Sequence, residues 1–306
     1  MTAAVDNKPG IASRLVNGVL AIKPLANLAK NRARQMMIQR AEKIGVPWTK
    51  IVQELKAYNW EAELAQVKNP QLIYPEYYLK SFHAYENGNL NWEAALEVEV
   101  AAYAVHAGIW ADGGAQGDAK LRSSYHQVLT SQIPTQPKDI LDLGCSVGMS
   151  SFALQEVYPN AKITGVDLSP YFLSVAQYQS RQRNAQIDWV HAQAESTPLT
   201  SNSYDLVSSF LMFHELPQSA TRQIFQEAQR LLRPGGYLTI MDMNPKSAIY
   251  GKMPPYILTL LKSTEPYLDE YFSLDIEQAL VEAGFTKPTI TCNTPRHRTI
   301  IAQKLG

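Results

Sequence analysis

Cysteine is scarce in this chain of 306 residues, which contains only Cys145 and Cys292. Two cysteines cannot build the disulfide framework of a small secreted domain, and they are too few for a zinc cluster. Six histidines are scattered along the chain without the spacing of metal ligands. We therefore expect no metal site and a reducing, cytoplasmic setting.

Long hydrophobic runs are also missing. The best candidate, residues 15–22, is short and is interrupted by Asn17 and Gly18, whereas a membrane-spanning helix needs about 20 apolar residues. The N-terminus does not show the order of charge, apolar core and small-residue cleavage site that marks a signal peptide. We therefore expect neither a spanning helix nor a signal peptide.

Neither sign of charge is in excess, because 28 Lys and Arg balance 28 Asp and Glu. A net charge of zero weighs against a nucleic-acid partner. The charge is unevenly spread, however, since residues 8–50 hold nine basic side chains and one acid, Glu42. This segment is rich in aliphatic residues, so it is suited to peripheral contact with an anionic membrane. A helical cap with a solvated basic face explains the same pattern, and the sequence leaves both open.

Helical periodicity dominates the first third of the chain. A loop rich in glycine, residues 111–117, follows it and is the expected linker. We predict an all-α N-terminal domain over residues 1–115 and a second domain over residues 116–306. The expected N-terminal helices cover residues 13–22, 25–44, 49–66 and 91–107, the last of them capped by Asn91.

Strands and helices alternate after residue 118, which indicates a mostly parallel sheet with helices on both faces. The expected strands cover residues 139–143, 162–167, 187–192, 204–211, 237–243, 289–292 and 299–304. The expected helices cover residues 119–131, 150–157, 170–184, 220–232 and 276–283. Residues 233–236 are expected to form a tight turn.

The loop after the first strand admits two interpretations. Read as Gly144-x-Ser146-x-Gly148, it matches the nucleophile elbow of a serine esterase, and Ser146, Asp242 and His297 follow in hydrolase order. Two features weigh against that interpretation. The chain before Asp139 looks helical, and no glycine-rich segment after an earlier strand is available for an oxyanion hole. The esterase is therefore a distant alternative.

The other interpretation is a nucleotide-binding loop. Gly144 and Gly148 let the backbone approach a ligand closely, and the next helix points its N-terminus at that ligand. Asp167 ends the second strand, where an acid can accept both hydroxyls of a ribose. Gln193-Ala194 ends the third strand and is placed to meet an adenine edge. Phe210 ends the fourth strand and is placed to stack on the ring.

Four segments in order resemble the successive motifs of class I S-adenosylmethionine-dependent methyltransferases, most nearly the ubiquinone and menaquinone C-methyltransferases. The resemblance covers roughly residues 120–306. It implies a Rossmann-like sheet of seven strands whose last strand runs antiparallel, with S-adenosylmethionine as the cofactor. The four segments are Ile140-Leu141-Asp142-Leu143-Gly144-Cys145, Val166-Asp167-Leu168-Ser169, Tyr204-Asp205-Leu206-Val207 and Leu232-Arg233-Pro234-Gly235-Gly236.

The resemblance also implies that Gly144 and its neighbours hold the methionine part of the cofactor and that Asp167 holds the ribose. The family usually has Gly where this chain has Ser146, and often Asp where it has Gln193; neither change argues strongly against binding. Asp142 either contacts the cofactor or orders the loop. The predicted cofactor-binding residues are Asp142, Gly144, Cys145, Ser146, Gly148, Asp167, Leu168, Gln193, Ala194 and Phe210.

A methyl acceptor needs a base only when it is an unionised hydroxyl or a carbon acid. His214 follows the fourth strand and is the best candidate base, since histidine titrates near neutral pH. A loop histidine bonded to the backbone explains the same residue. Asp242, at the end of the fifth strand, is the second catalytic candidate.

Two further regions are candidates for the acceptor pocket. Residues 250–271 occupy the usual place of a lid, and Tyr250 and Tyr267 lie in it. Glu99 and His106 share one face of a predicted helix, where core packing is the alternative explanation. The predicted substrate residues are Glu99, His106, Glu215, Tyr250 and Tyr267.

The sequence thus predicts an enzyme that transfers a methyl group from S-adenosylmethionine to a small, lipophilic acceptor by in-line displacement. A methyltransferase for protein or RNA is one alternative. An alternative of another class is a cofactor-binding module without catalysis that docks to a partner or a membrane. We expect a cytoplasmic protein, either free or peripheral to a membrane.

Overall fold

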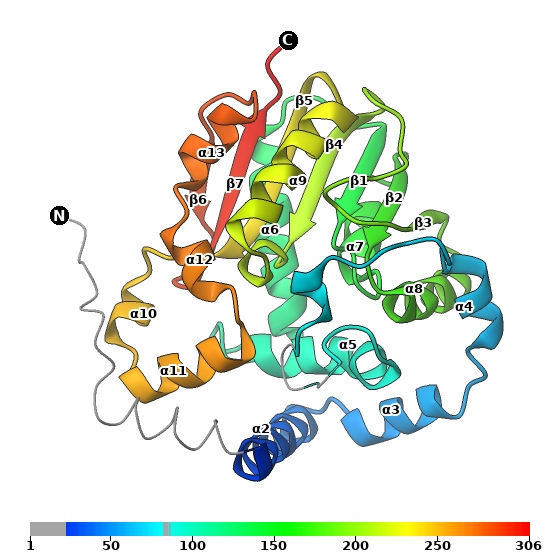
Figure 1. Cartoon of the computed structure of the whole chain (residues 1–306), viewed down its shortest axis with the longest axis vertical. Helices are drawn as coiled ribbons and strands as arrows, with labels where there is room; N and C mark the ends of the chain where they lie inside the picture. The colour runs from blue at the N-terminus through cyan, green and yellow to red at the C-terminus, as the bar shows by residue number, and fades with distance from the viewer. Residues whose placement is uncertain (1–22, 82–84, 86) are drawn as a thin grey trace.

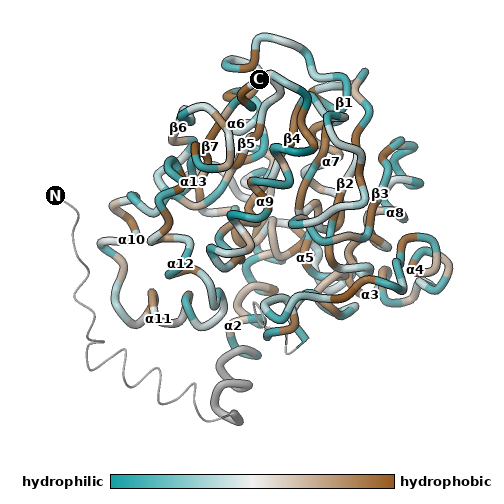
Figure 2. Tube along the Cα trace, turned by 45° about the horizontal axis from the view of Figure 1, so that its top comes forward, coloured by the Kyte–Doolittle hydropathy of each residue, from teal (hydrophilic) through white to brown (hydrophobic). Residues whose placement is uncertain are grey.

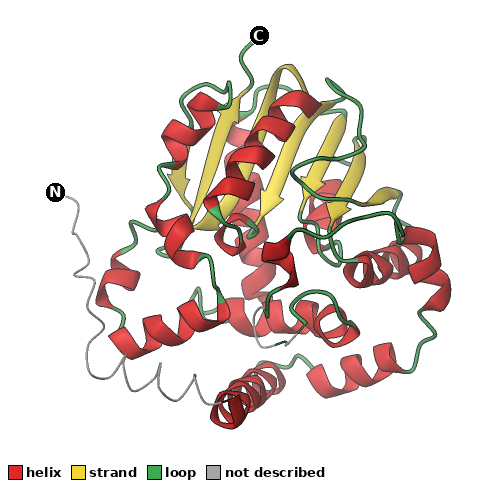
Figure 3. Ribbon diagram, viewed as in Figure 1, coloured by secondary structure: helices red, strands yellow, loops and turns green. Residues whose placement is uncertain are grey.

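The computed structural model describes residues 23–81, 85 and 87–306. Its centre is a seven-stranded sheet with the order β3-β2-β1-β4-β5-β7-β6 (Figure 1). The paired strands β1 to β5 run parallel, whereas β7 runs antiparallel to both β5 and β6. Helices cover both faces of the sheet (Figure 3). The predicted Rossmann-like, mostly parallel sheet is confirmed.

The strands lie close to where the sequence predicts them, because fully buried parallel strands read as continuous apolar runs. The predicted turn at residues 233–236 instead belongs to β5, where the pairing with β4 shifts register. Gly235, with φ of +78°, accommodates that irregularity. The strands are β1 Asp139–Leu143, β2 Lys162–Asp167, β3 Ile187–His191, β4 Tyr204–Phe210, β5 Leu232–Met243, β6 Thr289–Cys292 and β7 His297–Gln303.

Two apolar layers hold the helices against the sheet, and the strands between them are strongly hydrophobic (Figure 2). Leu141 and Leu143 of β1 pack on one face with α9 and α13, whereas Ile140 packs on the other with α6 and α7. This alternation follows from the two-residue period of a strand. The helices of this part are α6 Gly117–Gln132, α7 Met149–Val157, α8 Pro170–Arg183, η3 Phe213–Glu215, α9 Gln218–Leu231, α10 Ala248–Lys252, α11 Pro255–Thr264, α12 Leu268–Ser273 and α13 Ile276–Glu282.

The described N-terminal residues are mainly helical and lie beyond the carboxyl ends of the parallel strands (Figures 1 and 3). Helices α4 and α5 contact α8, and α2 and α3 contact α5. Asn91 caps α5 as predicted, because its side chain accepts a hydrogen bond from Ala94 N at 2.8 Å. The elements are α2 Lys23–Lys43, α3 Trp48–Lys56, α4 Glu61–Val67, η1 Glu76–Leu79, α5 Trp92–His106 and η2 Gly114–Gln116.

The helix predicted over residues 49–66 is wrong as a single element, since α3 and α4 are separate. Asn59 breaks it by accepting a hydrogen bond from Glu61 N at 3.0 Å, a local bond that competes with the helical ladder. The helix predicted over residues 13–22 lies outside the described residues. In the described residues no helix is both long and apolar enough to cross a bilayer. The division of the chain at residues 115 and 116 stays a prediction.

Candidate functional site

The loop between β1 and α7 requires glycine at two positions. Gly144 has φ of +69°, and a Cβ added there would lie 2.4 Å from Met212 Sδ. Gly148 has φ of +86°, and its Cβ would lie 2.8 Å from the Trp189 ring. Backbone N–H groups of Gly144 and Cys145 donate to Val166 O at 2.9 and 3.1 Å, which ties the loop to β2. The backbone of this loop is thereby fixed at the carboxyl edge of the sheet.

Asp167 holds this loop through one carboxylate oxygen and the turn that follows β2 through the other. Oδ2 accepts from Ser146 N at 2.8 Å, and Oδ1 accepts from Ser169 N at 2.8 Å. Burial raises the pKa of Asp167 to about 6, although these backbone hydrogen bonds oppose the shift. The Ser146 hydroxyl is buried and has no hydrogen-bond partner among the described residues. A carboxylate, a hydroxyl and glycine backbone thus meet where a ligand with ribose and polar groups fits.

Asp142 lies behind the loop and orders it. Its side chain is fully buried, and Oδ2 accepts hydrogen bonds from the hydroxyls of Ser150 and Ser151, each at 2.6 Å. These serines belong to the first turn of α7, so the carboxylate fixes the start of that helix. Burial raises the pKa of Asp142 to about 6. Of the two roles that the sequence leaves open, the geometry favours ordering of the loop.

One cavity of about 710 Å³ runs from this loop along the carboxyl edge of the sheet. Asp142, Gly148 and Gln193 lie outside its described lining, and Gln193 instead donates from Nε2 to Ile73 O at 2.5 Å. The other predicted cofactor-binding residues line it together. They are Gly144, Cys145, Ser146, Asp167, Leu168, Ala194 and Phe210.

A segment that the sequence interpretation missed, residues 69–78, crosses the end of β3. Asn69 N donates to His191 Nδ1 at 2.9 Å, and the Tyr77 hydroxyl donates to Glu195 Oε1 at 2.5 Å. Tyr77, Tyr78 and Glu195 all line the same cavity as Gly144 and Ser146 of the glycine loop. The cluster of Tyr74, Tyr77 and Tyr78 within five positions is the signal from which the segment could have been found.

The two predicted catalytic residues form a buried pair. His214 Nδ1 lies 2.7 Å from Asp242 Oδ1, and Asp242 Oδ2 accepts from the backbone N of Phe213 at 2.8 Å and of His214 at 3.3 Å. Burial acts to lower the pKa of His214, but the Asp242 carboxylate outweighs it and raises that pKa to about 10. Asp242 therefore favours the protonated form of His214, in which both ring nitrogens donate hydrogen bonds. His214 lines the cavity, whereas Asp242 lies behind it.

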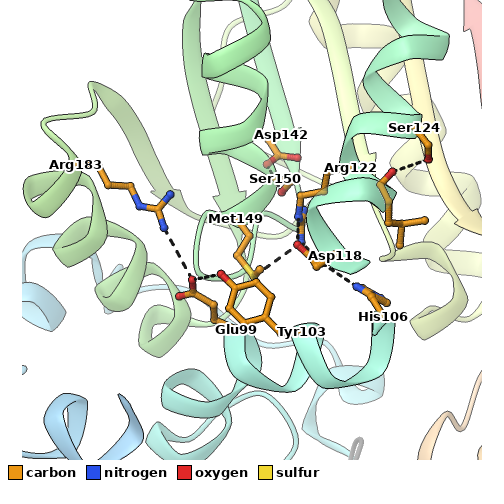
Figure 4. Close-up of polar contacts among 11 residues, drawn as sticks. Glu99, Tyr103, His106, Asp118, Arg122, Ser124, Asp142, Met149, Ser150 and Arg183 are labelled. Atoms are coloured by element: carbon orange, nitrogen blue, oxygen red, sulfur yellow. Dashed lines mark hydrogen bonds and ion pairs between the residues drawn. The ribbon is translucent and has the colours of Figure 1, made fainter. Parts of the chain in front are cut away.

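The predicted substrate residues separate into three groups. His106, Glu215 and Tyr250 line the cavity. Tyr267 is buried outside that lining and packs edge-on against Tyr77, with ring centroids 6.2 Å apart. Glu99 lines a different hollow, where it accepts from the Tyr103 hydroxyl at 2.7 Å and lies 3.9 Å from Arg183 (Figure 4). The structure thus brings three of the five to the cavity.

The residues of the esterase interpretation do not form a hydrogen-bonded triad, although Ser146 and His297 both line the cavity. Asp242 pairs with His214, and His297 Nδ1 lies 2.9 Å from Thr294 Oγ1. Ser146 donates its backbone N–H to Asp167, and its hydroxyl has no partner in the part of the chain that the structure describes. No group of three His, Cys, Asp or Glu side chains within the described ranges is arranged to hold a metal ion.

Part of the chain is similar to known methyltransferases. Residues 140–236 match the family described as "Methyltransferase domain". The ubiquinone biosynthesis O-methyltransferase of Psychrobacter arcticus is 30% identical over 175 residues, which cover 55% of this chain and 66% of that protein. This chain thus spans just under two thirds of that relative.

Solved structures share the fold. A candidate O-methyltransferase from Nostoc punctiforme has a TM-score of 0.54 and 19% identity, covering 70% of this chain and 59% of that one. Phosphoethanolamine N-methyltransferase 2 of Haemonchus contortus, solved with S-adenosyl-L-methionine, has a TM-score of 0.50 and 16% identity, covering 60% and 52%. Residues 140–236 are therefore a methyltransferase domain, and the fold is that of S-adenosylmethionine-dependent methyltransferases.

Proposed function

We propose that this protein transfers a methyl group from S-adenosylmethionine to a small, largely apolar acceptor. The observation that carries the proposal is one continuous cavity, which begins at the loop between β1 and α7 and continues into a chamber lined by the N-terminal helices and the segment between β5 and α13. The cofactor supplies a methyl group activated by a sulfonium. The protein supplies placement, which alone contributes up to roughly 7–11 kcal/mol of rate acceleration.

The walls of this chamber support an apolar acceptor. Aliphatic and methionine side chains reach it from α2, α5, β5 and the region of α10 and α11. Such walls bind apolar groups by removing them from water. They are Met37, Ala101, Val105, Met243, Met253, Ile257 and Leu261.

The pair His214–Asp242 supports an acceptor that also carries a polar group. A protonated His214 donates a hydrogen bond to an oxygen placed in the chamber, while Asp242 fixes its ring. Phe213 and His214 themselves are held by Asp242 through backbone N–H groups. The relative from Psychrobacter arcticus is named for O-methylation in ubiquinone biosynthesis, and an acceptor with an apolar body and a hydroxyl agrees with this chamber.

Titration calorimetry with S-adenosylhomocysteine tests the cofactor site. We expect saturable binding to the wild type and at least about a tenfold loss, or about 1.4 kcal/mol, in Asp167→Ala. Asp188→Ala is the matched control, because Asp188 is an exposed acid on neighbouring β3. Undetectable binding, or equal affinity in Asp167→Ala and the wild type, contradicts the proposal.

Transfer of a radiolabelled methyl group to phenols of increasing alkyl chain length tests the acceptor class. We expect turnover to improve with chain length and to be absent with a bulk protein or RNA fraction. Methylation of protein or RNA but of no lipophilic phenol, alcohol or carbon acid supports the alternative predicted from the sequence. Cofactor binding without transfer to any of these supports the non-catalytic module.

A second part of the proposal concerns residues 8–50. Within their described portion, Arg32, Arg40 and Lys43 are exposed on α2, which suits peripheral contact of a cytoplasmic protein with an anionic membrane. Flotation with vesicles containing phosphatidylserine tests it. We expect flotation that is lost when these three residues are changed to Gln, and equal flotation of both proteins contradicts the contact.

A further inference from the structure

A second pair of histidine and carboxylate faces the cavity from the N-terminal helices. His106, the last residue of α5, places Nδ1 2.8 Å from Oδ1 of Asp118 in the first turn of α6 (Figure 4). Arg122, one turn further along α6, donates from Nε to Asp118 Oδ2 at 2.8 Å. His106 and Arg122 both line the cavity. Histidine, carboxylate and guanidinium thus form a connected row that ends at the acceptor chamber.

The hydrogen bonds of this row determine which nitrogen of His106 is free. Burial acts to raise the pKa of Asp118, but Arg122 and His106 outweigh it and hold that pKa well below its usual range. An ionised carboxylate only accepts hydrogen bonds, so His106 Nδ1 carries the hydrogen. Arg122 already balances the charge of Asp118, and the row is neutral when His106 is uncharged. Nε2 of His106 then offers a lone pair.

His214 differs from His106 in how the charge of its partner carboxylate is balanced. The described partners of the Asp242 side chain are His214 and three backbone N–H groups, of Phe213, His214 and Met243. No cationic side chain bonds Asp242 there apart from His214 itself, so the proton on His214 balances the buried charge. A histidine that keeps its proton for this reason cannot also take one from an acceptor.

His297 stands across from His106, with ring centroids 6.3 Å apart and planes at 86°. Thr294 Oγ1 accepts from the backbone N of Arg296 and of His297, each at 3.1 Å. The threonine hydrogen is thereby left for His297 Nδ1 at 2.9 Å. Burial lowers the pKa of His297 to about 4, which favours the neutral ring, and a hydrogen bond accepted by Nδ1 from Thr294 leaves the ring hydrogen on Nε2. His297 also lines the cavity.

We propose that His106 is the general base that removes the proton from an acceptor hydroxyl, with Asp118 and Arg122 as its positioning residues and His297 as a hydrogen-bond donor to the same oxygen. This inference rests on the proposed methyl transfer. The acceptor O–H bond breaks and its proton passes to His106 Nε2. The oxygen electron pair forms the new bond to the methyl carbon, and the electron pair of the broken carbon–sulfur bond stays on sulfur.

The proposal gives the N-terminal helices a chemical role. Glu99 and His106 lie seven residues apart on α5, yet only His106 lines the cavity, and its partner Asp118 lies on the next helix. The base therefore comes from outside residues 140–236, the part that matches the methyltransferase domain. Residues of that domain hold the cofactor, and α5 with the start of α6 receives the proton.

The first test is the tautomer of each histidine, read from long-range ¹H–¹⁵N correlation spectra of protein labelled at histidine nitrogen. In the wild type at neutral pH we expect hydrogen on Nδ1 alone for His106 and on Nε2 alone for His297. Asp118→Asn should allow the hydrogen of His106 to move to Nε2. If His106 of the wild type carries a hydrogen on Nε2, whether the ring is neutral or protonated, the proposal is overturned. This measurement needs no bound ligand.

The second test uses 4-nitrophenol as the probe, bound in the presence of S-adenosylhomocysteine in a buffer that keeps the free probe mostly neutral. We expect the bound probe to show the long-wavelength absorbance of its phenolate in the wild type. The absorbance should be lost in His106→Gln and reduced in Asp118→Asn. His126→Gln is the control, because His126 is a buried histidine of α6 that lines the other hollow.

Every outcome of the experiment with 4-nitrophenol either supports or overturns the role of His106 as the base. Equal phenolate absorbance in His106→Gln and the wild type assigns the proton to another group and overturns the proposal, as does a probe that fails to bind or binds only as the neutral phenol. If His106→Gln does not fold, Asp118→Asn serves as the variant, since it keeps the shape of the carboxylate. Failure of S-adenosylhomocysteine to bind refutes the proposed function instead and leaves the tautomer result standing.

Discussion

His214 and Asp242 are joined by a 2.7 Å contact between Nδ1 and Oδ1, although 28 residues separate them in the sequence. Asp242 lies near the end of β5, and His214 lies in η3 just after the neighbouring strand β4. Parallel strands that pair in register deliver their ends to one edge of the sheet. The contact therefore follows from the strand order and places a pair of histidine and carboxylate beside the cavity.

Asp242→Asn should remove the cause of the raised pKa of His214. In the wild type, this histidine is expected to stay protonated from neutral pH until about 10; in the variant its pKa should fall, because burial is then opposed only by the contributions of Glu265 and Glu215. Histidine NMR titration measures the pKa of His214 in both proteins. His126 is the internal control, since burial lowers its pKa to about 4 and Asp242 does not contribute.

The same pair makes stability depend on pH. A histidine whose pKa is raised on folding stabilises the native state fully below its unfolded pKa of about 6.5, and that contribution is lost as the pH rises through about 10. Breaking a buried pair typically costs about 3–5 kcal/mol. The difference in unfolding free energy between wild type and Asp242→Asn should therefore shrink between about pH 7 and pH 10. A constant difference over that range contradicts the raised pKa.

Asp142→Asn tests a dependence of stability on pH that has the opposite sign. The pKa of Asp142 is raised by burial to about 6, so the charged form is disfavoured in the folded state, and the cost appears as the pH rises from about 4 to about 7. Its upper size is on the order of 3 kcal/mol. The variant should gain stability relative to wild type across that range, measured by urea denaturation. If the stability of the variant relative to wild type does not increase as the pH rises, the result contradicts a raised pKa of Asp142.

Gly144→Ala should weaken cofactor binding at least about tenfold by calorimetry. The added Cβ meets Met212 Sδ at 2.4 Å and forces a left-handed φ of +69° on alanine. Met212→Ala in the same chain should restore part of the affinity by removing the clash and leaving the backbone strain. Gly251→Ala is the matched control, because nothing lies within 4 Å of its Cβ. Unchanged affinity in Gly144→Ala would show that the loop does not approach the cofactor closely.

Arg34 and Glu97 should prove to be strongly coupled. Arg34 Nε donates to Glu97 Oε2 at 2.9 Å, and the Glu97 side chain has no exposed surface. Arg34→Ala leaves this carboxylate with Tyr85, whose hydroxyl donates at 2.9 Å. We expect faster hydrogen exchange in α2 and a coupling energy of about 0.5–3 kcal/mol in a double-mutant cycle with Glu97→Gln. Arg32→Ala, on the exposed side of α2, should change neither the hydrogen exchange in α2 nor the coupling energy. Additive effects of the two changes would refute the coupling.

The sequence was sufficient for the sheet and for the position of the glycine loop after β1. β1, β2 and β6 have their predicted bounds, since short buried or alternating apolar runs and flanking glycines are local features. Gly144 and Asp167 could be placed at one edge because strands joined by helices in one parallel sheet end on the same side. These are consequences of short-range pattern and of the handedness of parallel connections.

Only the tertiary structure decided which polar side chains face the cavity. Gln193 bonds Ile73 O, 120 residues away, and Glu99 turns to Tyr103 and Arg183 although His106 shares its helix. The pairing of His106 with Asp118 depends on how α5 and α6 meet. Periodicity identifies the buried face of a helix but not the partner that covers it, because packing between distant segments selects among faces of similar hydrophobicity.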